Sequence, residues 1–389
     1  MAMWKATSSL VGLLLAGVAA TPAHAETVRS EQWHLDAMNA DDMWKLSTGR
    51  GVTVAVIDTG VSRIPELDDR VVPGQDFAPG AFEGDERVDY RNHGTSMAAI
   101  IAGNGRGPGG LESAMGLAPG AKVQPVRVDM NGNGLSVNTT LADAVRYAAD
   151  SEAKILNISL AWSDGDALRG AVNYAVAKGK LIFAASGNDG GTQPNFPAAI
   201  PGVIGIGAVD RGGGATKEST HNAWVDLSAP GVDIISGCSG STGLCTSHGT
   251  SDATALASAS AALLWSVHPT WTNNQILRVL LNTAGKPVDG AERNDYIGYG
   301  VVRPRIALPT PGDPGPPDVY PLPDLAAAAA EDTPVPSTGG KTTPPQAPQA
   351  APAVDKGDGG TPPWLALGLG ASALIGGAVA AVVVRRAGR

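Results

Sequence analysis

Two copies of the tetrapeptide HGTS, His93–Ser96 and His248–Ser251, contain the residue types that nucleophilic catalysis needs. A serine hydroxyl attacks a carbonyl carbon efficiently when a neighbouring histidine takes its proton and a carboxylate orients that histidine. Each copy holds one histidine and one serine, and each is followed by an alanine-rich run that predicts a helix. The pattern alone therefore does not decide which copy supplies the base and which supplies the nucleophile.

Two further polar residues stand at, or just beyond, the ends of predicted strands. Asp58 ends the run VTVAVID, and Asn188 follows LIFAAS in the segment SGNDG. In parallel sheets the functional crevice lies beyond the carboxyl ends of the strands, so residues at these positions are candidates for chemistry. Aspartate and asparagine are also common in turns and helix caps, and each residue is weak evidence alone.

The elements that must position these residues alternate along the chain between Gly51 and Val302. Short apolar runs predict five strands, over 52–58, 122–128, 154–160, 181–186 and 203–209. Stretches between them predict two helices, over 138–150 and 167–179. Continuous apolar strands that alternate with helices predict an α/β fold, in which a parallel sheet is covered by helices on both faces.

Taken together, the four motifs resemble those of the subtilisin-like serine proteases. VAVIDTGV is similar to the family's aspartate motif, HGTSMAAIIAG to its histidine motif, AASGNDG to its oxyanion-asparagine motif and HGTSDATALASASAALL to its serine motif. They occur in the family's chain order, and the α/β pattern agrees with a subtilisin-like fold. The resemblance implies a catalytic triad of Asp58, His93 and Ser251, with the Asn188 side-chain amide and the Ser251 N–H in the oxyanion hole.

The same order separates the roles of the two HGTS copies. A nucleophile at Ser96 would lie three residues from its own histidine, beside the ring on one helix rather than across a cleft from it. Ser251 instead follows the aspartate, histidine and asparagine motifs and begins a long alanine-rich run. We therefore expect His93 to be the base and Ser251 the nucleophile, while Ser96 and His248 have no catalytic role.

The resemblance also implies a protein or peptide substrate and no cofactor. Ser159, Leu160 and Ala161 would flank this substrate, which would lie between chain segments as an added strand. The segment Asp129–Gly134 matches the start of a calcium-binding EF-hand loop, but Thr140 stands where that loop requires glutamate. We therefore expect a turn there and no metal site.

Two positions depart from the family's serine motif. Asp252 stands where an apolar residue usually follows the nucleophile, and Ala255 replaces the usual proline. A carboxylate in the first turn of a helix is favourable to the helix dipole by about 0.3 to 1 kcal/mol, so the fold should accept Asp252. Its negative charge should raise the pKa of His93 if the two side chains lie close together.

The segment EQWHLDAMNADDMWKLSTGRGVTVAVIDTGV narrows the resemblance to the mycosins, which are membrane-anchored subtilases associated with type VII secretion. This resemblance implies a serine endopeptidase outside the cytoplasmic membrane that processes exported proteins of such a system. The alternative is a scaffold of the secretion machinery that uses the protease fold as a docking surface. The complete set of triad residues favours the enzyme.

The two ends of the chain have the composition of targeting segments. Residues 1–25 predict a cleaved signal peptide, with a retained membrane anchor as the alternative. Residues 364–384 carry no charge and are long enough for one transmembrane helix, and the basic tail 385–389 is expected in the cytoplasm. Between the ends we expect a catalytic domain with an N-terminal extension over 26–308, and a disordered tether rich in Pro, Ala and Thr over 309–363.

The cysteines and the net charge bear on two questions: whether the chain forms a disulfide, and whether it binds nucleic acid. Cys238 and Cys245, the two cysteines of the chain, have six residues between them. In an exported protein we expect them to form a disulfide, worth about 2 to 3 kcal/mol in the chain-entropy model, with two free thiols as the alternative. The formal net charge of −9 gives no support for nucleic-acid binding, which usually leaves a basic footprint.

Overall fold

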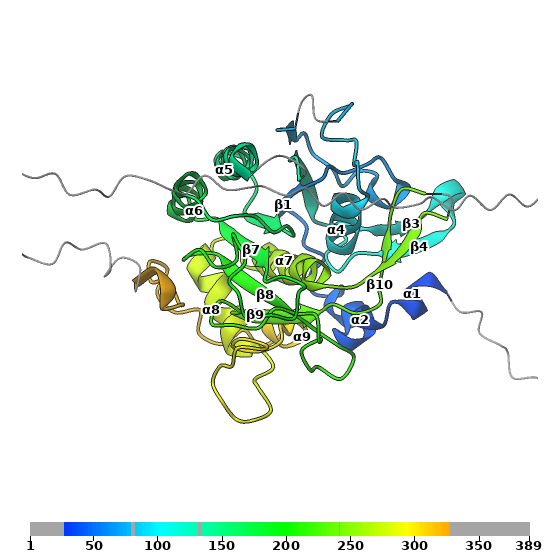
Figure 1. Cartoon of the computed structure of the whole chain (residues 1–389). Helices are drawn as coiled ribbons and strands as arrows, with labels where there is room; N and C mark the ends of the chain where they lie inside the picture. The colour runs from blue at the N-terminus through cyan, green and yellow to red at the C-terminus, as the bar shows by residue number, and fades with distance from the viewer. Residues whose placement is uncertain (1–26, 79–81, 131–133, 241, 327–389) are drawn as a thin grey trace, which may run out of the picture. The chain divides into compact units, whose positions relative to one another are not determined.

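A seven-stranded sheet forms the centre of the structure, which is a computed structural model describing residues 27–78, 82–130, 134–240 and 242–326 (Figure 1). Its strands are β1 Thr53–Asp58, β2 Gln75–Asp76, β5 Lys122–Arg127, β6 Ile155–Ile158, β7 Leu181–Ala185, β8 Ile204–Val209 and β9 Leu227–Pro230. They lie in the order β2-β5-β1-β6-β7-β8-β9, and every pairing is parallel. The carboxyl ends of all seven strands therefore meet at one edge of the sheet.

The apolar runs form strands because both faces of the sheet are covered. Strand β1 is buried from Val54 to Asp58. Val54 and Val56 pack in one hydrophobic cluster, while Ala55 and Ile57 pack in another, as expected when successive side chains of a strand point to opposite faces. The prediction of an α/β fold with a parallel sheet and helices is confirmed.

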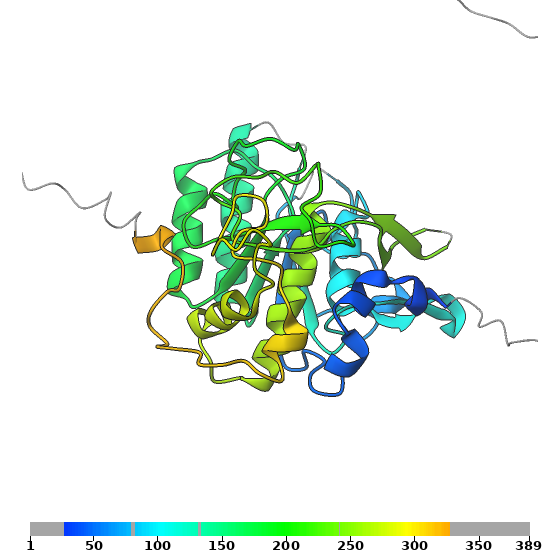
Figure 2. The same ribbon diagram turned by 90° about the horizontal axis from the view of Figure 1, so that it is seen from below.

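Helices cover each face of this sheet (Figure 2). Helices α5 (Gly134–Asp150) and α6 (Asp166–Ala177) pack against each other and contribute to the hydrophobic cluster on one face. Helices α4 (His93–Ala102), α7 (Thr250–Val267) and α8 (Asn273–Thr283) contribute to the cluster on the other face. Helix α7 contacts strands β6, β7, β8 and β9 and is buried along nearly its whole length, which is why its sequence is so rich in alanine.

Several smaller elements lie outside the central sheet, and none of them was predicted. They are the paired strands β3 Asn104–Arg106 and β4 Glu112–Met115, the paired strands β10 Ile234–Gly237 and β11 Leu244–Ser247, the short helix α9 Pro304–Ala307, and the 3-10 turns Pro65–Leu67 and Pro108–Gly110. Both strand pairs are antiparallel. A disulfide between Cys238 and Cys245, with a Cα–Cα distance of 5.9 Å, closes the β10–β11 hairpin as the sequence led us to expect.

The N-terminal extension is part of the folded body. It forms the three short helices α1 Val28–Glu31, α2 Trp33–Ala37 and α3 Ala40–Met43. The Trp33 Nε1 atom donates to the Val232 oxygen at 2.8 Å, and the Trp44 Nε1 atom donates to the Leu117 oxygen at 2.9 Å. The two indoles therefore fasten the extension to segments that are far away in the sequence.

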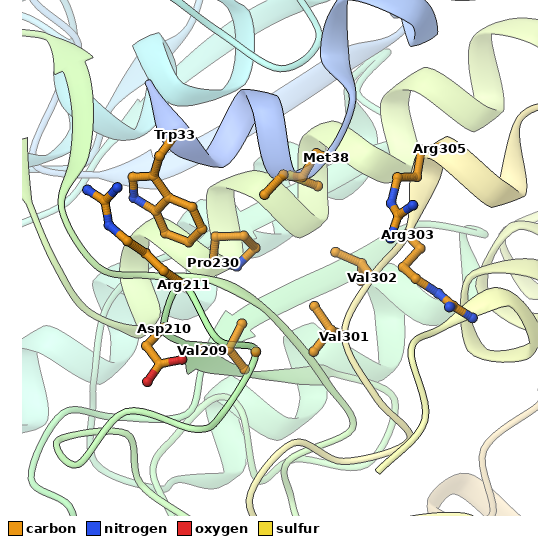
Figure 3. Close-up of a pocket in the computed structure, with 12 residues that line it drawn as sticks. Trp33, Met38, Val209, Asp210, Arg211, Pro230, Val301, Val302, Arg303 and Arg305 are labelled. Atoms are coloured by element: carbon orange, nitrogen blue, oxygen red, sulfur yellow. The ribbon is translucent and has the colours of Figure 1, made fainter. Parts of the chain in front are cut away.

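A cavity of about 190 Å³ lies between α2, the loop after β8 and the segment before α9 (Figure 3). Trp33, Met38, Val209 and Pro230 supply apolar walls. The guanidinium carbon of Arg211 lies 5.0 Å from the centroid of the Trp33 ring, at one side of the cavity. None of the residues to which the sequence assigns a catalytic role lines this cavity.

Residues 309–326 differ from the extended tether expected from the sequence. The Arg278 guanidinium on α8 donates to the backbone oxygens of Pro314 and Pro316, and Leu322 is buried in the hydrophobic core. The proline-rich composition predicted no structure because it lacks apolar periodicity. Arginine has five N–H donors, however, and can satisfy several carbonyl groups of a segment that is poor in donors of its own.

The expected signal peptide 1–25, the transmembrane helix 364–384, the tail 385–389 and the remainder of the tether lie outside the described residues. The described residues belong to one compact unit, Met1–Pro334. Within them, no helix is both long enough and apolar enough to cross a membrane.

We predict that a chain spanning residues 27–326 is more stable than one spanning residues 27–308. The shorter chain loses the apolar surface that Leu322 buries and leaves Arg278 without its carbonyl acceptors. Burial of a leucine side chain contributes about 1.5 to 3 kcal/mol, and the entropy lost on ordering the segment offsets part of this, so the free energy of unfolding should fall by up to that amount. Urea denaturation of the two proteins measures the difference, and identical transitions would show that the segment contributes nothing.

Candidate active site

Two of the residues with predicted roles meet at the carboxyl end of β1. Asp58 is the last residue of β1, and His93 is the first residue of α4. The His93 Nδ1 atom lies 2.8 Å from the Asp58 Oδ1 atom. The Asp58 side chain is fully buried, whereas 32% of the His93 side chain is exposed. This arrangement fixes the orientation of the ring and leaves Nε2 as the nitrogen available for proton transfer.

Glycine at position 94 allows α4 to begin directly against β1. A Cβ atom on Gly94 would lie 2.3 Å from the Gly60 oxygen and 2.9 Å from the Asp58 Cβ atom. The Gly94 N–H also donates to Thr59 Oγ1 at 3.1 Å, so the first turn of the helix is hydrogen-bonded to the strand end. Any larger residue at this position would push His93 away from its carboxylate.

Asp89 supports the same corner, and the sequence analysis did not identify it. Its Oδ1 atom accepts from the Thr59 hydroxyl at 2.7 Å, and its Oδ2 atom accepts from the Thr95 N–H at 2.8 Å and from the Thr95 hydroxyl at 2.6 Å. Asp89 thus satisfies an N–H group in the first turn of α4 that has no partner within the helix. Asp89 could have been recognised as an acidic residue just before a predicted helix, because such residues often accept hydrogen bonds from the free N–H groups of the first turn.

Ser251 is the second residue of α7, and two reciprocal hydrogen bonds attach it to the end of β6. The Ser251 hydroxyl donates to the Ser159 carbonyl oxygen at 3.1 Å, and the Ser159 hydroxyl donates to the Ser251 carbonyl oxygen at 3.0 Å. Behind them, the Asn157 amide donates to Ser159 Oγ at 3.0 Å and accepts from the Ser258 hydroxyl at 2.9 Å. This buried polar chain fixes the start of α7 against the sheet.

Asn188 lies after β7 and faces the start of α7. Its Oδ1 atom accepts from the Thr250 N–H at 2.8 Å and from the Thr250 hydroxyl at 3.0 Å. A Cβ atom on Gly249 would lie 3.0 Å from Asn188 Nδ2, and the φ angle of +136° at Gly249 also favours glycine. The amide is therefore oriented with its oxygen toward the helix backbone, and its NH₂ group is the end that can serve a ligand.

The other residues singled out in the sequence lie at different depths. Ser159 and Leu160 are buried, whereas Ala161 is exposed. Of the three residues expected to flank the substrate, Ala161 is therefore the one that lies at the surface. Ser96 is buried within α4, on the same helix as His93. His248 is exposed and precedes the cap of α7.

No cluster of three or more His, Cys, Asp or Glu side chains that could hold a metal ion occurs within the described residues. Part of the loop Asp129–Gly134, residues 131–133, lies outside them. The candidate residues contribute a carboxylate, an imidazole, a serine hydroxyl and an amide, a set of groups that suits acyl transfer.

Residues 49–300 match the profile of the Subtilase family, Peptidase S8. The chain belongs to the subtilase family. A thermophilic serine proteinase from Bacillus sp. (strain AK1) is 37% identical over 264 residues, which cover 67% of this chain and 62% of that protein. The match therefore spans less than two thirds of the length of that relative.

Solved structures show which members of the subtilase family this chain is similar to. MycP1 from Mycobacterium smegmatis matches with a TM-score of 0.65 at 29% identity, covering 75% of this chain and 87% of that one. The MycP3 protease from the type VII (ESX-3) secretion system matches with a TM-score of 0.63 at 32% identity, covering 71% and 87% respectively. The resemblance to subtilases, and to the mycosins among them, is confirmed.

The imidazole of this subtilase lies among carboxylates. Burial alone would lower the pKa of His93, but the charge and hydrogen bond of Asp58 outweigh it, and the charges of Asp252 and Asp89 add to the effect, so that the pKa is raised. Asp252 is itself buried and accepts from the Ser247 hydroxyl at 2.6 Å. Burial raises the pKa of Asp252 to about 6, although that hydrogen bond and the nearby imidazoles oppose the shift. Asp252 thus acts on His93 in the expected direction.

We predict that Asp252→Asn moves the acidic limb of the activity profile to lower pH. His93 must be neutral to accept a proton, and asparagine keeps an acceptor for Ser247 while removing a charge that favours the imidazolium. The pKa of His93 then falls, and activity should extend to lower pH. The pH dependence of kcat/KM measures this shift, with Asp36→Asn on α2 as the control. An unchanged limb would mean that the Asp252 charge does not reach the ring.

Proposed function

We propose that this subtilase is a serine endopeptidase that cleaves peptide bonds through Asp58, His93 and Ser251. The supporting observation is the 2.8 Å contact between Asp58 Oδ1 and His93 Nδ1 at the sheet edge. Helix α4, which begins with His93, packs against α7, whose first turn carries Ser251. The family match over residues 49–300 supports the same chemistry.

Proton transfer starts the proposed reaction. The Ser251 hydroxyl leaves the Ser159 carbonyl and turns toward His93 Nε2 by rotation between staggered positions of one torsion. His93 takes the hydroxyl proton as Ser251 Oγ bonds to the carbonyl carbon of the substrate. Asp58 keeps the ring in place and stabilises the imidazolium that forms.

The carbonyl oxygen of the substrate then becomes an oxyanion, and two donors stabilise it. One is the Ser251 N–H at the start of α7, where backbone N–H groups lack helical partners. The other is the Asn188 NH₂ group, whose orientation the Thr250 hydrogen bonds hold. When the intermediate collapses, His93 returns the proton to the departing amine. Water releases the acyl group by the same steps, again with His93 as base.

The substrate that we propose is an exported protein, bound as an added strand beside Ser159, Leu160 and Ala161. The end of β6 supports this placement, because Ser159 there already contacts the Ser251 hydroxyl. The free Ser159 carbonyl would become available as the hydroxyl turns away. No cofactor is required for this chemistry.

The proposed location is the outer side of the cytoplasmic membrane, with a type VII secretion complex as partner. MycP3, a relative by structure, is described as a protease of such a system. The uncharged stretch 364–384 and the basic tail 385–389 support a single anchoring helix. Residues 1–25 support export of the body.

We predict that a fluorophosphonate, which phosphonylates an activated serine, labels the wild-type protein and fails to label Ser251→Ala. The variant removes the proposed attacking oxygen and should leave the packing of α7 intact. Ser96→Ala and His248→Ala should keep most of the labelling. Mass spectrometry of intact protein measures the adduct, and circular dichroism confirms folding. Labelling of folded Ser251→Ala would refute the assignment, and absence of labelling in the wild type would favour the scaffold role.

We predict that deleting residues 364–389 releases a folded, labelling-competent body from the membrane. The deletion removes the proposed anchor and leaves every described residue in place. Fractionation of cells that express the full-length and the shortened chains measures the distribution. If the shortened chain stays with the membrane, another segment must anchor it.

A further inference from the structure

A single hairpin contacts the sequence neighbours of both the proposed base and the proposed nucleophile. In this hairpin β10 and β11 pair antiparallel, with Ser236 opposite Cys245. The Cys238–Cys245 disulfide closes it, and the Cys238 N–H donates to the Gly243 oxygen at 3.0 Å. Strand β10 packs against α4 (Figure 1). The cross-linked hairpin therefore lies beside the helix that carries the base.

The first contact joins the hairpin to Asn92, the residue directly before His93. The Ser239 N–H donates to Asn92 Oδ1 at 2.8 Å, and Asn92 Nδ2 donates back to the Ser239 carbonyl oxygen. Ser239 directly follows Cys238, so the clamp lies next to the disulfide. Asn92 caps α4 in the left-handed conformation, with φ of 65°, which asparagine tolerates better than most residues.

The second contact joins the other strand of the hairpin to Asp252, the residue directly after Ser251. Ser247, at the end of β11, donates its hydroxyl to Asp252 Oδ1 at 2.6 Å. Only 1% of Asp252 is exposed, so this bond is shielded from water. Strand β11 thus contacts the first turn of α7 through Ser247. The loop between β10 and β11 contacts the N-terminal cap of α4 through Ser239.

We propose that the disulfide-closed hairpin is a positioning element that sets the placement of His93 relative to Ser251. The two residues begin separate helices, and their placement depends on how those two helix ends are held together. A two-stranded hairpin is marginally stable by itself, so the disulfide keeps Ser239 and Ser247 at a fixed spacing. Asn92, Ser239 and Ser247 act through the catalytic residues and are not catalytic themselves. This inference rests on the proposed serine-protease function.

The test compares three variants with the wild type by their rates of inactivation with a fluorophosphonate. Asn92→Gly removes both side-chain hydrogen bonds to Ser239 but retains the left-handed backbone, which glycine adopts without strain. The double variant Cys238→Ser, Cys245→Ser opens the hairpin. Asn39→Gly is the matched control, because Asn39 is also left-handed and also caps a helix, but lies in the N-terminal extension.

We expect Asn92→Gly and the double cysteine variant to react at least about 10-fold more slowly, because a misplacement of about 1 Å can cost about 100-fold in rate. The loss should appear in the maximal rate of inactivation, while the concentration of reagent at half-saturation stays unchanged. Combining the two changes should slow the reaction no further than the double cysteine variant alone, since opening the hairpin already loosens the contact that Asn92→Gly removes. Asn39→Gly should react like the wild type.

Reduction of the wild type provides an independent arm of the same test. Dithiothreitol converts the disulfide to two thiols and is itself oxidised to a cyclic disulfide. The treated wild type should slow to the rate of the cysteine variant, whose rate should not respond to the reagent. If the cysteine variant fails to fold, the rates of Asn92→Gly and of the reduced wild type still test the inference. Wild-type rates in both would overturn the inference, whereas absence of reaction in the untreated wild type would instead overturn the proposed function.

Discussion

The hydrogen bond between Asp58 and His93 involves a carboxylate that water does not reach. The surrounding structure must therefore supply the hydrogen-bond donors that water would otherwise provide. A buried carboxylate is costly unless donors surround it. Asp58 Oδ1 accepts from the Thr59 N–H at 2.8 Å and lies 2.8 Å from Nδ1 of the His93 ring. These donors converge only if the end of β1 and the start of α4 touch, which the absence of a side chain at Gly94 permits.

Two layers of the fold supply the site, and polar contacts join them. The carboxylate comes from the sheet, whereas the imidazole and the serine hydroxyl come from the first turns of two helices on one face. The chain of hydrogen bonds from Ser258 through Asn157 to Ser159 ties α7 to β6, and Asn188 ties it to the end of β7. Buried polar networks that are fully satisfied specify one arrangement of the elements that they join.

Five of the seven sheet strands and the helices α4, α5, α6 and α7 could be predicted, because each is an apolar or alanine-rich run of suitable length. The short strands β2 and β9 and helix α8 were not predicted. Asp58, His93, Ser251 and Asn188 could be proposed as site residues because they stand at strand or helix ends in the order of a known family's motifs. Asp89 and the β10–β11 hairpin could not, because their value depends on contacts that exist only after folding. The same holds for residues 309–326, whose proline-rich sequence suggests an extended chain until Arg278 binds its carbonyl groups.

The N-terminal extension has a consequence for when this protein can acquire its structure. The Ser47 hydroxyl donates to the carbonyl oxygen of Leu263 at 2.7 Å, across 216 positions of sequence. Asp58 and Ser251, the proposed orienting carboxylate and nucleophile, are likewise far apart in the sequence. Such non-local contacts form late, because a long loop must close before they can. The proposed triad can therefore be complete only after the chain as far as Ser251 is available to fold.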